Sequence, residues 1–174
     1  MATLIKNAKI IADSWQRLER TAVDTFPPLP AAGDLLVPLA WWQAAASRLL
    51  AHPGRIGVWL DGGDEPSRIA DSLQAFGVIA VHFPHFTDGR GYSTARLLRE
   101  RYGWRGELRA IGDVQRDQLY YLSRCGFDAF ELKDGTDAEA ALSAFGDFSE
   151  AYQASVERPL PLFRRRGVEG GLKP

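Results

Sequence analysis

A glycine-flanked arginine is the densest signal for chemistry in this 174-residue chain. Gly89 and Gly91 surround Arg90, and Ser93 follows where a helix is expected to begin. Glycine lets the backbone approach a ligand closely, and the free amides at a helix start together with a guanidinium can hold an anion. We therefore expect these four residues to bind an oxyanion such as sulfite, sulfate or phosphate. The alternative is an ordered loop in which Arg90 pairs with Asp88 or another carboxylate.

Acidic side chains recur where the predicted strands of the chain end. In parallel α/β folds the carboxyl ends of the strands share one edge of the sheet, and ligands bind there. Carboxylates at this edge could perform acid–base chemistry or bind a hard cation. They could instead cap the following helices, because they satisfy free amides and complement the helix dipole. The candidates for this strand-end polar site are Asp61, His85, Asp88, Asp113 and Glu131.

Histidine and cysteine offer few options for a metal or a redox cofactor. The three histidines are scattered, and His82 lies inside an apolar run, which predicts a hydrogen-bonded core or rim residue. The single cysteine, Cys125, excludes an intramolecular disulfide and a cysteine-built zinc or iron–sulfur site within the chain. Neither the phosphate-loop pattern nor the dinucleotide fingerprint occurs. We expect no metal and no cofactor.

Apolar runs alternate with amphipathic segments along most of the chain. Such alternation predicts repeated βα units, and hence an α/β fold with a mainly parallel sheet. Four or five units are too few to close an eight-stranded barrel, which favours an open sheet or a partial β/α barrel. We expect strands over 56–60, 78–83, 108–111 and 127–132, and helices over 41–50, 66–76, 92–102, 114–124 and 138–151.

The two ends of the chain depart from this pattern. Residues 3–20 begin with two short apolar stretches around Asn7, which predicts an N-terminal β-hairpin. Prolines make 24–34 a connector inside a single domain over 1–155. Residues 156–174 contain proline and glycine, and we expect an extended arm that packs on the body or on a second subunit.

Composition and charge exclude several classes of function. With a net charge of −1, the chain has no global field that would attract nucleic acid. No apolar run approaches the roughly 20 residues of a membrane span, and 1–13 lack the apolar block of a secretory signal, so we expect a cytoplasmic protein. Arginine supplies 17 of the 21 basic residues, which a G/C-rich genome explains. Several arginines gather over 90–109, either as a solvated face or as a docking patch for an acidic partner.

Three segments, 86–103, 106–118 and 124–132, carry a close resemblance to a known family. They resemble the bacterial domain of unknown function 934 family, and the resemblance extends over about 34–155. Members of this family are often labelled oxidoreductases of sulfite reduction. The resemblance therefore implies a place beside sulfite reductase in sulfur assimilation, and it brings no established catalytic residues with it.

The match to the family pattern differs between the candidate residues. The Asp-Gly-Arg-Gly stretch from Asp88 to Gly91 and the pair Gly112–Asp113 match the pattern. His85 occupies a position that varies among members, which weakens any mechanism that uses it as an essential base or ligand.

Two functions follow from the sequence. The first is an accessory protein that docks to sulfite reductase or another sulfur-assimilation enzyme. The alternative is a small enzyme or oxyanion-binding domain with its site at the carboxyl ends of the parallel strands. The family label implies an oxidoreductase, but the chain carries no redox-cofactor motif. We expect neither nucleic acid nor a membrane as partner, and a homodimer is one way to cover an exposed edge strand.

Overall fold

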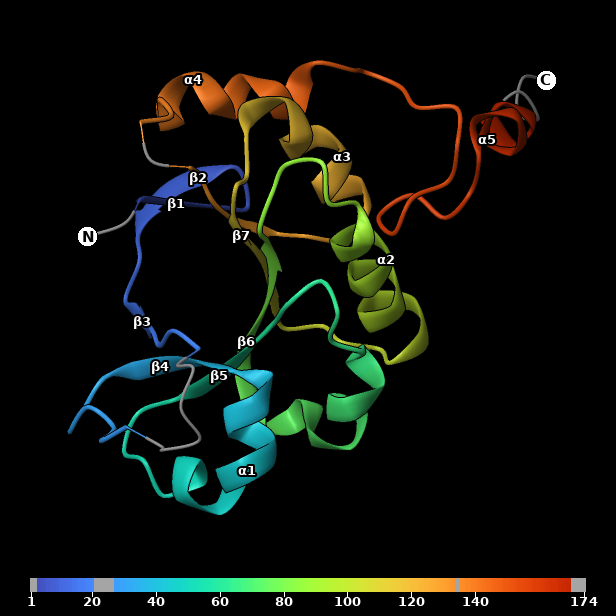
Figure 1. The fold of residues 1–174 in the computed structure, drawn as a ribbon. Helices are drawn as coiled ribbons and strands as arrows, with labels where there is room; N and C mark the ends of the chain where they lie inside the picture. The colour runs from blue at the N-terminus through green and yellow to red at the C-terminus, as the bar shows by residue number, and fades with distance from the viewer. Residues whose placement is uncertain (1–2, 21–26, 134, 170–174) are drawn as a thin grey trace.

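The computed structural model describes residues 3–20, 27–133 and 135–169 (Figure 1). Parts of the expected connector, 24–26, and of the expected C-terminal arm, 170–174, lie outside these residues. The strands are β1 (Thr3–Lys6), β2 (Lys9–Ala12), β3 (Trp15–Arg17), β4 (Asp34–Pro38), β5 (Ile56–Leu60), β6 (Phe76–Phe83), β7 (Glu107–Gly112) and β8 (Ala129–Glu131). The α-helices are α1 (Leu39–Leu50), α2 (Arg90–Arg96), α3 (Leu119–Arg124), α4 (Ala138–Leu142) and α5 (Leu162–Glu169).

Shorter helical segments of other types complete these elements. A 3-10 helix, η1 (Pro66–Ala75), connects β5 to β6. A π-helical turn, η2 (Leu97–Arg101), prolongs α2, and the 3-10 turn η3 (Arg116–Gln118) leads into α3. A last 3-10 turn, η4 (Ser143–Gly146), extends α4. In the described part of the chain, no helix is long and apolar enough to cross a membrane.

The eight strands of the described residues belong to one sheet, in the order β2-β1-β8-β7-β6-β5-β4-β3. Strands β3 to β8 pair in parallel, whereas β1 is antiparallel to both β2 and β8. The expected N-terminal hairpin is present, with Asn7 and Ala8 at positive φ in its turn. The expectation of a mainly parallel sheet is corrected to a mixed one, because this hairpin joins the free edge of β8 in the antiparallel direction.

The sheet is curled into an open half-barrel. Its two edge strands, β2 and β3, are consecutive in the chain and separated only by Asp13 and Ser14. Three successive Cα–Cα steps span at most about 11 Å, so the two edges of the sheet must approach each other. A flat sheet of eight strands could not satisfy this connection. Of the two forms that the sequence left open, the structure therefore has the partial barrel.

The two faces of the curled sheet have different surroundings. In β6, Ile79 and Val81 belong to the large core beneath the helices, whereas Val78 and Ala80 belong to a small cluster on the other face. This alternation is the two-residue period of a strand. Figure 1 shows α1, α2 and α3 along the outer face, so the small cluster marks the concave face. Its buried residues are Leu36, Trp59, Val78, Ala80 and Ile111, with Trp15 packed against them.

Three expectations about single elements need correction. The helix expected over 138–151 ends at Gly146, in a 3-10 turn. Strand β3 was not expected, because three residues are too few to show an alternating pattern. The arm expected to be extended contains α5, which follows Pro161. Proline has no amide hydrogen to lose at the start of a helix, so it is compatible with this position.

Candidate functional site

The register of the parallel sheet places an aspartate beside a histidine at the carboxyl edge. Leu60 of β5 pairs with Val81 of β6, so the next residues, Asp61 and His82, lie side by side. His82 Nδ1 is 3.3 Å from Asp61 Oδ1, and the imidazole packs edge-on against the Trp59 ring at a centroid distance of 5.7 Å. Both polar side chains are about one-third exposed. The pair is therefore fixed by the sheet and still open to solvent.

A second layer of charged groups holds the loop after β5. The Asp64 carboxylate accepts hydrogen bonds from the Asp61 amide at 2.9 Å and from Arg20 Nη2 at 3.0 Å. The Arg20 guanidinium also lies 3.8 Å from Asp61 Oδ2 and 5.4 Å from the centre of the Trp59 ring. These contacts fix the direction in which the Asp61 carboxylate points.

The Asp61 carboxyl group has a pKa below its usual value. Burial would raise the pKa of Asp61, but hydrogen bonds from the Gly62 amide and from His82, and the nearby charge of Arg20, outweigh it. Each of these neighbours stabilises the ionised form. Asp61 is therefore a carboxylate at neutral pH and can act as a hydrogen-bond acceptor for His82.

Arg90 is held by a carboxylate in the loop that follows β6. Its Nη2 lies 2.6 Å from Asp88 Oδ2 and its Nε 2.9 Å from Asp88 Oδ1, and this contact lowers the pKa of Asp88 to about 2. The pair lies against Gly62, where an added Cβ would stand 2.7 Å from Arg90 Nη2. Arg90 thus adopts the ordered-loop arrangement of the sequence analysis, and its side chain is still 61% exposed.

The glycines beside Arg90 have separate structural explanations. A Cβ on Gly91 would lie 2.5 Å from Phe83 Cζ, so this glycine lets α2 pack closely on β6. Gly89 has open space around the same position, and its φ is −83°. Ser93 is exposed on α2, a helix of seven residues. The expected anion site at these residues stays a prediction.

Two of the expected strand-end carboxylates are paired with cations of their own. Asp113 Oδ1 lies 2.9 Å from Lys133 Nζ, and its Oδ2 accepts a hydrogen bond from the Phe86 amide. Glu131 forms an ion pair with Arg17 of β3 at 2.7 Å. His85 contributes its carbonyl to the loop turn, where it accepts the amide of Asp88. The structure thus brings Asp61, Asp88 and Arg90 together around Gly62. Asp113 and Glu131 instead form ion pairs that connect separate parts of the chain.

Sequence reasoning missed two members of this group. His82 is a hydrogen-bonded rim residue, as expected, but it was not among the predicted site residues and its partner is Asp61. The signal was available, because His82 shares the strand parity of Val78 and Ala80 and stands one residue before the end of β6. Arg20 carried no signal, since it lies outside the repeated βα pattern.

The basic region over 90–109 presents less exposed charge than its sequence implies. Arg99 is buried and donates to the carbonyls of Gly126 and Trp104 at 2.8 and 2.9 Å. Arg109 is buried in the half-barrel, and Arg96 pairs with Glu100 on the helix surface. Within the described residues, no group of three or more histidine, cysteine or acidic side chains could hold a metal ion.

Comparison with known proteins gives one family. A family model described as "Bacterial protein of unknown function (DUF934)" matches residues 57–163, which is more than half of the chain. The matched region contains β6 to β8 with their helices, and it includes both His82 and the loop that carries Arg90. Comparison with curated proteins found no match.

Proposed function

The chain belongs to the DUF934 family of bacterial proteins, and we propose that it is a small acid–base enzyme that works at the carboxyl edge of its half-barrel. The observation that carries this proposal is the contact between His82 Nδ1 and Asp61 Oδ1. Histidine is the side chain best suited to exchange protons near neutral pH.

His82 is the group that would exchange a proton with the substrate. With its proton on Nδ1, the ring donates to Asp61 and presents Nε2 as the proton acceptor. The Asp61 carboxylate then fixes the ring orientation and stabilises the imidazolium that forms after proton transfer. Asp61 is the positioning residue in this arrangement, and Arg20 and Asp64 hold its loop.

The charges at the edge favour one class of substrate. Three carboxylates, of Asp61, Asp64 and Asp88, lie there with two guanidinium groups, of Arg20 and Arg90. Because both guanidinium groups already contact carboxylates, a highly charged anion would meet little uncompensated positive charge. We propose a small, neutral or singly charged molecule with an exchangeable proton on oxygen, with the exposed side of Arg90 as its anchor. Bisulfite, which the family label makes relevant, has these properties.

Isothermal titration calorimetry with sulfite, sulfate and phosphate tests this proposal. We expect sulfite to bind to the wild type, His82→Gln to abolish most of the heat, and Arg90→Ala to weaken binding. His52→Gln is the matched control, because His52 contacts the Gly33 carbonyl on another part of the surface. Identical isotherms for the wild type and His82→Gln would sink the proposal.

A second candidate function, docking to sulfite reductase, is favoured by an exposed aromatic ridge. We define this ridge by Phe86, Tyr92 and Tyr121. Gln118 Nε2 donates to the Phe86 carbonyl and contacts Tyr92 Oη, and the Tyr92 and Tyr121 rings lie 5.1 Å apart. Phe86 and Tyr121 are each 51% exposed. Tyr92 is half-buried beside Tyr121, and exposed aromatic side chains such as Phe86 and Tyr121 are typical of protein–protein contact surfaces.

A pull-down with sulfite reductase at low salt tests the docking function. We expect Phe86→Ser combined with Tyr121→Ser to abolish co-purification. Tyr152→Ser is the control, because this exposed tyrosine lies on the C-terminal segment and contacts Phe163. Equal recovery of sulfite reductase by all three proteins, or by none, would contradict docking through the ridge.

A further inference from the structure

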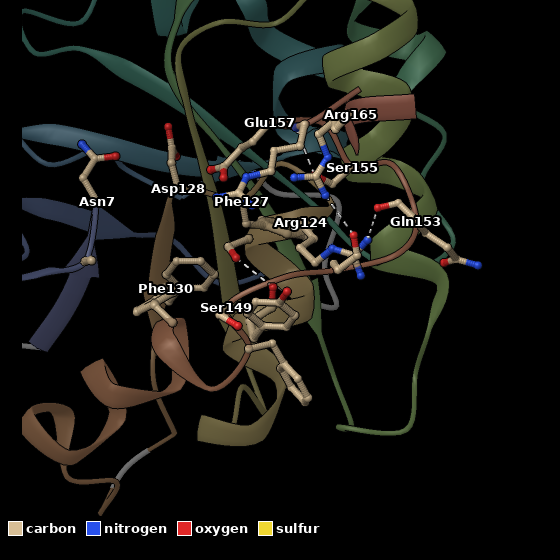
Figure 2. A pocket seen from close by; sticks show the side chains of 17 residues that line it. Asn7, Arg124, Phe127, Asp128, Phe130, Ser149, Gln153, Ser155, Glu157 and Arg165 are labelled. Carbon is tan, nitrogen blue, oxygen red and sulfur yellow. Dashed lines mark hydrogen bonds between the residues drawn. The ribbon is translucent and has the colours of Figure 1, made fainter. Parts of the chain in front are cut away.

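A cavity of about 310 Å³ lies near the amino end of β8 (Figure 2). It is bounded by α3, by the turn of the N-terminal hairpin at Asn7 and Ala8, and by the C-terminal segment 148–165. Phe127 and Asp128, which line it, directly precede β8. His82 stands near the carboxyl end of β6, so this cavity and the carboxyl edge lie at opposite ends of the sheet.

Part of the cavity wall is aromatic. Phe127 and Phe130 are buried beneath it, and Phe130 packs against Phe145 with ring centres 5.4 Å apart. Tyr120 of α3 packs against Phe148 at 4.9 Å. Tyr120 and the exposed Phe148 offer a surface on which a planar or apolar molecule can stack.

Another part of the wall carries three arginines from separate elements. Arg124 ends α3, Arg158 lies in the C-terminal segment, and Arg165 belongs to α5. The acidic residues that line the cavity are Asp128 and Glu157, and Glu150, which is not part of the lining, pairs with both Arg158 and Arg165. Arg124 is occupied by the carbonyl of Gln153 at 2.9 Å.

Arg165 has a donor without a partner. Its Nη2 contacts Glu150 at 2.9 Å and the Ala151 carbonyl at 3.1 Å, but its Nε is buried and makes no hydrogen bond. A buried N–H without an acceptor is unfavourable, and native proteins rarely leave one. The Arg165 side chain as a whole is 22% exposed and lines the cavity, so its guanidinium group can meet a ligand oxygen there.

We infer that this cavity binds a small organic anion with an aromatic or apolar body, whose anionic group is bound by Arg165 while its body stacks on the aromatic wall. A carboxylate, a sulfonate and a phosphate share this chemistry. The inference uses none of the residues proposed to act at the carboxyl edge, so either proposal can fail while the other stands.

Calorimetric titration of the full chain with 1-naphthalenesulfonate tests this site. We expect the wild type to bind the probe and Arg165→Gln to bind it about tenfold more weakly, the loss expected when one charge-assisted hydrogen bond is removed. Arg164→Gln is the matched control. This substitution removes the same charge from the same helix, but Arg164 does not line the cavity. We expect the control to stay within about twofold of the wild type. The uncharged analogue 1-naphthalenemethanol should bind more weakly than the sulfonate, while benzoate and phenyl phosphate distinguish the three anionic groups.

A further variant separates ligand binding from support of the C-terminal segment. Glu150→Gln removes the carboxylate that pairs with Arg165 but keeps the guanidinium. If Arg165 binds the probe directly, this variant binds as tightly as the wild type or more tightly. Weakening of both Glu150→Gln and Arg165→Gln to the same degree would show a structural role only. That result, no binding to the wild type, or equal binding by Arg165→Gln and Arg164→Gln would each overturn the inference.

Discussion

Arg109 is the largest fully buried side chain of the described residues, with 1% of it exposed. Its Nη1 lies 2.7 Å from Asp13 Oδ2, and its Nη2 lies 2.6 Å from Glu107 Oε1. Lys6 also contacts Glu107, at 2.7 Å. Glu107 and Arg109 belong to β7, Lys6 belongs to β1, and Asp13 lies in the link between the edge strands β2 and β3. The network therefore ties the interior of the half-barrel to the place where its two edges meet. A buried charge of this kind is tolerated because every partner is present.

Replacing Arg109 with methionine should be strongly destabilising. The variant leaves the buried carboxylate of Asp13 without its cation and Glu107 with Lys6 alone, and we expect the free energy of unfolding to fall by about 3–5 kcal/mol. Arg55→Met is the control, since the Arg55 side chain is 65% exposed in its pair with Asp34, and its loss should cost less than about 1 kcal/mol. Urea unfolding measures both values. Equal losses in the two variants would show that the interior network does not stabilise the fold.

Asp61 should make stability depend on pH in a defined direction. Its folded pKa lies below the unfolded value of about 3.9, so its contribution is present above that pH and is lost as pH falls through the folded pKa. The stability difference between the wild type and Asp61→Asn, from urea unfolding at pH 3 to 7, should therefore shrink toward acid pH.

Asp128 is a control for which stability should depend on pH in the opposite direction. Burial raises the pKa of Asp128 despite the Leu108 amide and Arg99, so its contribution is present below the unfolded pKa and is lost as pH rises through the folded pKa. The difference between the wild type and Asp128→Asn should fall toward neutral pH. The same pH trend in both variants would contradict the two assignments.

At the scale of elements, the packing of α2 on β6 depends on one of the two glycines beside Arg90. A Cβ on Gly91 would stand 2.5 Å from Phe83 Cζ and 3.0 Å from Val81 Cγ1, whereas the same position on Gly89 is open. The two glycines that predict an anion-binding loop therefore differ in the fold, because only Gly91 is tightly packed. Close packing of the helix accounts for the second glycine.

Alanine at these two positions should give different results. We expect Gly91→Ala to lower the free energy of unfolding by about 1–3 kcal/mol, because α2 or Phe83 must shift. Gly89→Ala should change it by less than about 1 kcal/mol, since φ there is negative and the space is free. Thermal unfolding of both variants checks this, and a Gly91→Ala protein as stable as the wild type would refute the packing explanation.

Elements with long apolar patterns could be predicted from the sequence, and elements with short ones could not. Strands β5 to β8 and the hairpin were predicted because their apolar runs are bounded by turn residues. Strand β3 was not, because Trp15–Arg17 is short and is placed by its pairing with β4. The helix α5 was not predicted, because proline argues against regular structure inside a segment, whereas Pro161 stands where the helix begins.

For the whole molecule, the half-barrel explains why some site residues could be predicted and others could not. Asp61 follows a clear strand, so its place at the carboxyl edge was predicted. Its contact with His82 depends on the register between β5 and β6, which is a property of the assembled sheet. Arg20 reaches this edge because β3, which precedes it, pairs with β4 in the assembled sheet. No local sequence pattern could have predicted that position.

The most direct test of the carboxyl-edge site is long-range ¹H–¹⁵N NMR of the imidazole nitrogens during a sulfite titration. The chain has three histidines, so each ring can be assigned with single substitutions. We predict that free His82 carries its proton on Nδ1, that its Nε2 resonance moves as sulfite binds, and that His52 stays unchanged. Unchanged His82 resonances at saturating sulfite, or a His82 proton on Nε2 in the free protein, would contradict a site built on His82 and Asp61.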